Sequence, residues 1–138
     1  MPAGTPPESA KASLVLVHEH LLFRLLLERS LSKEFRLSCF SGAEDALAFI
    51  QTTSSLDVLV TGLKTDFSPL GGCNIARGAR QRFPNALIYV FSSGLPSDDY
   101  RVNLLRTMVD IKILSTPLNA LFLRRKIRSA LQGKASAT

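Results

Sequence analysis

His18, Glu19 and His20 directly follow an apolar run, and all three side chains are of types that hold metal ions or transfer protons. If the chain is still extended there, the two histidines point to the same side, because side chains alternate along a strand. A transition-metal site is one interpretation, but the motif lacks a third ligand at a suitable spacing. We prefer the other interpretation, in which both histidines fill or cap a pocket at the end of the strand.

The apolar run Leu56–Gly62 ends without a carboxylate, although the carboxyl end of a buried parallel strand is where such sheets carry their sites. Gly62 has no side chain that could act as a nucleophile. Asp66 lies beyond it in a loop that we expect to point away, and Asp57 stands at the opposite end of the run. Neither aspartate is therefore expected to supply the missing group. Gly62 instead allows the loop to close over this position.

Five short apolar runs alternate with five helical patterns, and these elements must position the side chains above. Such alternation with short connections indicates a parallel sheet with helices on both faces. We predict the α/β flavodoxin-like class, a doubly wound five-stranded parallel sheet with strand order 2-1-3-4-5. The predicted strands are 13–17, 36–40, 56–62, 86–91 and 111–114, and the predicted helices are 21–32, 43–51, 73–83, 98–108 and 120–132.

Cap and turn residues set the predicted ends of the last two helices. Ser97 is expected to cap the helix 98–108, with Asp98 and Asp99 in its first turn. Asn119 is expected to cap the last helix and Gly133 to end it. The predicted organisation is therefore a disordered arm over 1–12, one domain over 13–132 and a tail or truncated linker over 133–138.

The helix 21–32 carries more apolar residues than one core face can use. Leu21, Leu22 and Leu25 fall outside the face that we expect in the core, which consists of Phe23, Leu26, Leu27, Ser30 and Leu31. In this fold the first and last helices lie side by side, which would place Leu121 and Phe122 near those leucines. Exposed contiguous apolar residues mark partner or dimer surfaces. The alternative is that these side chains pack against each other and stay mostly buried.

Composition narrows the class of protein. The 138 residues carry a net charge of +6, which favours acidic partners such as nucleic acid, phosphorylated ligands or acidic protein surfaces. No apolar run reaches membrane-spanning length and the N-terminus does not resemble a signal peptide, so we expect a soluble, cytoplasmic protein with no membrane partner. Cys39 and Cys73 lack metal-ligand spacing and are expected to be buried thiols.

The order and spacing of five segments resemble the receiver domain of two-component response regulators. The segments are VLVHEHLLFRLLLERSL, FSGAEDALAFI, LDVLVTGL, RQRFPNALIYVFSSG and ILSTPLNAL. The resemblance implies a pocket with two acids after strand 1, a phosphoryl-accepting aspartate after strand 3, a Ser or Thr after strand 4 and a Lys-Pro pair after strand 5. The matching positions hold His18 and Glu19, Gly62, Ser92, and Thr116 with Pro117, and the aromatic switch position holds Ile113.

These departures imply a degenerate receiver, or pseudo-receiver. Gly62 cannot accept a phosphoryl group, and Glu19 beside a neutral His18 is a poor Mg²⁺ site. Thr116 lacks the positive charge that would compensate a phosphoryl group. We therefore expect no enzymatic activity, weak or absent Mg²⁺ binding and no other cofactor or metal.

Two functions remain open for such a domain in signal transduction. The first is a phosphorylation-independent protein-interaction or dimerisation module, whose partner is another protein or a second copy; its interface would be Leu21, Leu22, Leu25, Leu121 and Phe122. The second is binding of an acidic ligand, a cyclic dinucleotide or nucleic acid, by arginines that suit phosphate; alternatively, the chain is the regulatory domain of a longer transcription regulator. The arginines are Arg124, Arg125 and Arg128 on the last helix and Arg77, Arg80 and Arg82 on the third.

Overall fold

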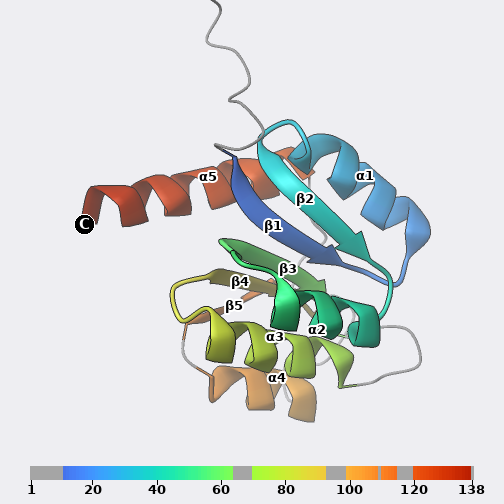
Figure 1. The fold of residues 1–138 in the computed structure, drawn as a ribbon. Coiled ribbons are helices and arrows are strands. Elements are labelled where there is room, and N and C mark those ends of the chain that lie inside the picture. The colour runs from blue at the N-terminus through green and yellow to red at the C-terminus, as the bar shows by residue number, and fades with distance from the viewer. Residues whose placement is uncertain (1–10, 64–69, 93–98, 109, 115–119, 138) are drawn as a thin grey trace, which may run out of the picture.

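Five parallel strands form one sheet in the computed structural model, which describes residues 11–63, 70–92, 99–108, 110–114 and 120–137 (Figure 1). The strand order β2-β1-β3-β4-β5 confirms the predicted flavodoxin-like topology. All neighbouring pairs are parallel. The strands are β1 Ala12–Val17, β2 Phe35–Phe40, β3 Val58–Gly62, β4 Leu87–Phe91 and β5 Ile111–Leu114.

Helices cover both faces of the sheet (Figure 1). They are α1 Leu21–Leu31, α2 Ala43–Thr52, α3 Gly71–Arg82, α4 Tyr100–Arg106 and α5 Ala120–Ala137. Alternate residues of β1 serve opposite faces. Leu14 and Leu16 pack in a core with α1 and α5, whereas Val15 and Val17 pack in a second core with α2, α3 and α4. None of these helices, over the residues that the structure describes, is long and apolar enough to cross a membrane.

Two predicted helix ends were wrong. Asp99 is the cap of α4 rather than a residue of its first turn, because its carboxylate accepts the N–H of Arg101 at 2.9 Å. Gly133 does not end α5, which continues to Ala137, so most of the predicted tail is helical. A glycine inside a helix costs only about 1 kcal/mol, and the residues that follow it include two alanines and no proline. Ser97, Asp98 and Asn119 lie outside the described residues.

The core face of α1 is narrower than predicted. Leu27 and Leu31 are fully buried and Phe23 packs against the same core, so the buried stripe follows the i, i+4, i+8 spacing. Leu26 lies 100° around the helix from Leu27 and is 65% exposed, which contradicts its assignment to the core. The first half of α1 therefore presents leucines to solvent over a wide face.

Candidate functional site

The carboxyl ends of the strands bring His18, Gly62 and Ser92 to one edge of the sheet. Val17 is the register partner of Thr61, and Gly62 is the partner of Phe91. The pairing continues past the strands, because Leu63 donates its N–H to the carbonyl of Phe91 at 3.0 Å. Thr116 and Pro117, which were predicted at the same edge, and Asp66, which was predicted to point away from it, lie outside the described residues.

His18 lies among aromatic rings. Its ring centroid is 4.5 Å from that of Phe23 and 6.0 Å from that of Phe91, and its Nδ1 accepts the N–H of His20 at 3.0 Å. Burial lowers the pKa of His18 below 6.5, and the neighbouring His20 and Arg24 act in the same direction. His18 is thus a neutral aromatic side chain at neutral pH, and it offers no carboxylate to a divalent cation.

His20 and Arg24 hold the start of α1. His20 is the N-cap residue, and its Nδ1 accepts the N–H of Phe23 at 3.3 Å. Arg24 donates from Nη1 to the carbonyl of His18 at 2.8 Å. The two histidines therefore have structural roles, one packing on aromatic rings and the other capping the helix. Glu19, between them, is exposed, and no group of three metal-ligating side chains occurs among the residues that the structure describes.

The start of α3 covers the backbone beside Gly62. Gly72 donates its N–H to the carbonyl of Leu63 at 2.9 Å. A Cβ at Gly72 would lie 2.2 Å from the carbonyl oxygen of Gly62, so the approach is possible only for glycine. The hydroxyl of Thr61 donates to the same Gly62 carbonyl at 2.9 Å. Sequence reasoning missed Gly72, although the Gly71-Gly72 pair at a helix start was a signal for close packing.

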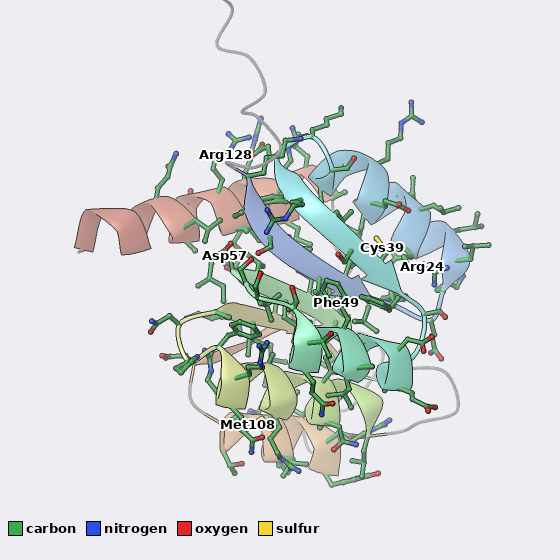
Figure 2. The ribbon with its side chains drawn as sticks, viewed as in Figure 1. Arg24, Cys39, Phe49, Asp57, Met108 and Arg128 are labelled. Carbon is green, nitrogen blue, oxygen red and sulfur yellow. The ribbon has the colours of Figure 1, made fainter. Side chains whose placement is uncertain are left out.

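Ser92 and Ile113 were also matched to the receiver pocket. Ser92 is buried, and its N–H donates to the carbonyl of Leu114 at 2.9 Å. Ile113 is half-buried against the core that contains α3 and α4. Asp57 lies at the other end of the sheet, where it accepts the N–H of Ser13 at 2.8 Å. Figure 2 shows Asp57 and Arg24 near opposite ends of β1, so Asp57 cannot act at the edge that carries Gly62.

The helices α1 and α5 present six exposed large apolar side chains, which we call the α1–α5 face. The five side chains predicted as an interface are all exposed, and Leu26 adds to them. The exposed fractions are 54% for Leu21, 67% for Leu22, 47% for Leu25, 65% for Leu26, 40% for Leu121 and 57% for Phe122.

Most of the arginines proposed to bind an anion already have partners within the chain. Glu34 pairs with Arg124, with 3.2 Å between Nε and Oε1, and also with Arg128. The two arginines lower the pKa of the Glu34 carboxyl, Arg128 having the larger effect. Arg80 donates to the carbonyls of Pro84, Ala86 and Asp110, and Arg82 donates to those of Ile50 and Thr53. Arg77 and Arg125 are exposed.

Comparison with known proteins gives structural likeness only. No protein-family model matches the sequence, and no curated protein matches it significantly. A response regulator receiver protein from Sinorhizobium medicae superposes with a TM-score of 0.76 at 21% identity, over 90% of this chain and 97% of the other. The signal receiver domain of an HD domain-containing protein from Pseudomonas fluorescens gives 0.75 at 20% identity, over 99% and 97%.

A third solved structure, a response regulator receiver domain protein from Clostridium thermocellum, gives a TM-score of 0.73 at 18% identity, over 92% of this chain and 99% of that one. These structures are covered almost from end to end, and the strand order is the one predicted from the sequence. The chain therefore has the receiver-domain fold of response regulators.

Proposed function

We propose that this chain is a degenerate receiver domain that acts in signal transduction by binding another protein through the α1–α5 face, without phosphorylation. The observation that carries the proposal is the exposure of Leu22, Leu25 and Leu26 on one side of a helix that uses other residues for its core. Exposed apolar side chains that gather on one face mark interaction surfaces.

The strand-end chemistry supports the first half of the proposal. An acyl phosphate forms on a carboxylate, and Gly62 provides none. His18 stands where the resemblance places a metal-binding acid, and its packing on Phe23 and Phe91 keeps it neutral. The backbone of Gly72 lies against the Gly62 carbonyl, and a side chain at position 72 would overlap that carbonyl. A phosphoryl-driven switch has no group on which to act at this position.

The second candidate function, binding of an acidic ligand by arginines, is less favoured. Arg124 and Arg128 would have to leave the carboxylate of Glu34, and Arg80 would have to release the carbonyl oxygens to which it donates. Each such step gives up an existing hydrogen bond or ion pair, and the partly buried ones, Arg80 to Ala86 and Arg124 to Glu34, are the most costly to break. An anion would need to offset these losses before any net affinity appeared.

A phosphorylation assay tests the first half of the proposal. The purified chain is incubated with acetyl phosphate and Mg²⁺, or with beryllofluoride and Mg²⁺, and examined by intact mass and by ¹⁵N–¹H spectra. We expect no added phosphate and no shifts at the carboxyl ends of the strands. A hydroxylamine-sensitive mass gain of one phosphate would overturn this half.

A variant comparison tests the second half. We expect the double change Leu22→Ser and Leu25→Ser to abolish partner capture from a lysate of the source organism, whereas His18→Ala with Ser92→Ala retains it. Tyr100→Ser is the matched control, because Tyr100 is a large exposed side chain on α4, on the other side of the sheet. Circular dichroism first establishes that every variant is folded. Capture that survives the leucine changes but fails with the strand-end changes would contradict the assignment.

A further inference from the structure

The α1–α5 face combines exposed apolar side chains with positive charge. The helix α5 contains five basic residues and no acidic residue: Arg124, Arg125, Lys126, Arg128 and Lys134. Two of them pair with Glu34, but Arg125 and Lys126 are exposed. They follow Leu121 and Phe122 directly on the next turn of the helix, and Nζ of Lys126 lies 6.0 Å from the centroid of the Phe122 ring. The apolar end of α5 is therefore bordered by cations.

The exposed leucines of α1 have a similar border. Arg29 is exposed and follows Leu25 and Leu26 at the i+4 and i+3 positions, which places it on the same side of the helix. Within the part of the chain that the structure describes, no carboxylate lies within ion-pair distance of Arg29, Arg125 or Lys126. Both helices thus carry exposed cations beside exposed apolar groups.

We propose that the α1–α5 face binds an amphipathic segment of another protein in which acidic residues flank the apolar side. This inference rests on the proposed function and adds the chemistry of the partner. Leucine side chains would supply the apolar contact area, and Asp or Glu of the partner would meet Arg29, Arg125 and Lys126. Complementary charges at the rim of an interface select the partner and raise the rate of association.

A second copy of this chain fits less well, because joining two such faces would place the same exposed cations, Arg29, Arg125 and Lys126, on both sides of the contact. Single-stranded nucleic acid would meet leucines at the centre of the face, which offer no aromatic platform for base stacking.

The test uses two synthetic helical peptides of about 18 residues, or five turns. Both carry leucines at i, i+3, i+4 and i+7 positions; one has Glu along both flanks and the other has Lys at the same places. Each peptide is titrated into the ¹⁵N-labelled full chain, and the affinity is read from amide shifts. We expect the Glu peptide to perturb α1 and α5 and to bind about tenfold or more tightly than the Lys peptide. The change Arg125→Glu with Lys126→Glu should reverse this preference, and Leu22→Ser with Leu25→Ser should abolish binding of both peptides.

The remaining outcomes overturn the inference. Equal affinity for the two peptides, or no binding of either, contradicts an acid-flanked partner. Sedimentation that shows a dimer lost on Leu22→Ser with Leu25→Ser assigns the face to a second copy, and cosedimentation with phosphatidylglycerol vesicles assigns it to a membrane. If the leucine variant loses partner capture while charge reversal changes no peptide preference, the proposed function stands and only this inference fails. If the leucine variant keeps capture, the proposed function itself fails.

Discussion

Replacing Gly72 with alanine places a methyl group in the contact between the first turn of α3 and the end of β3. The new Cβ would lie 2.2 Å from the carbonyl oxygen of Gly62, 2.6 Å from Cα of Leu63 and 2.7 Å from the Leu63 carbonyl oxygen. All three neighbours are backbone atoms, so no side-chain rotation can relieve the overlap. The start of α3 has to move away from the sheet.

The cost follows from two terms and one partial offset. Overpacking of this kind costs about 1–3 kcal/mol. Movement of α3 also stretches the bond from Gly72 N–H to the Leu63 carbonyl, worth about 1 kcal/mol. Alanine regains up to about 1 kcal/mol of helix propensity. We expect a net loss of about 2 kcal/mol in the free energy of unfolding, which lowers the melting temperature by about 6–10 °C for a domain of this size.

Thermal and urea unfolding followed by circular dichroism measure this loss. Gly133→Ala is the matched control, since nothing lies within 4 Å of a Cβ at that position. The control should be neutral or stabilising by up to about 1 kcal/mol, because alanine favours the helix. If the Gly72→Ala variant is as stable as the unsubstituted chain, the first turn of α3 does not pack closely against the backbone of Gly62, and the close approach described above is wrong.

Three further predictions concern the strand end and the ion pairs. Gly62→Asp should gain no phosphate from acetyl phosphate with Mg²⁺, because the carboxylate would lack a compensating cation and a pair of acids; a stable phosphorylated species in the intact mass would refute this. The lowered pKa of His18 means that the folded state binds fewer protons than the unfolded state as pH falls below 6.5. The contribution of His18 to the free energy of unfolding is therefore present above pH 6.5 and is lost on acidification. In the variant His18→Gln, the urea midpoint should fall less steeply on acidification than in the unsubstituted chain. Glu34→Gln should lower the free energy of unfolding by about 1 kcal/mol, because it removes the carboxylate that pairs with the half-buried Arg124. The exposed control Arg125→Gln should change the urea midpoint little, and equal effects of the two changes would contradict the pairing.

The sequence was sufficient to predict the sheet and the place of the strand-end residues. The runs around Val15, Val60 and Val90 are short, apolar and separated by helical patterns, and connections of that length allow only a parallel sheet with a few strand orders. Once the order is known, His18, Gly62 and Ser92 must meet at one edge, because the carboxyl ends of parallel strands lie together. The absence of a carboxylate at Gly62 is a matter of residue type and needs no structure.

The exposure of individual side chains and the contacts between distant residues could not be predicted from the sequence. Periodicity placed Leu26 beside Leu27, but the two side chains differ by 100° of rotation, and the position of the sheet beneath α1 decided that only Leu27 is buried. Gly133 was predicted to end the last helix. The helix-propensity cost of glycine relative to alanine, about 1 kcal/mol, is too small to stop a helix when the residues that follow favour the helical conformation.

The sequence by itself thus determined the fold class and the absence of a carboxylate at Gly62, because both depend on residue types and local spacing. Only the tertiary structure decided which arginines are already paired and which could bind an anion. Arg128 contacts Glu34 across 94 residues of chain, and no local sequence pattern encodes that pair. The tertiary structure also decided that Gly72 closes over the Gly62 backbone. Both contacts arise when α5 and α3 pack on opposite faces of the sheet, and packing of distant segments is set by the whole core rather than by any one stretch of sequence.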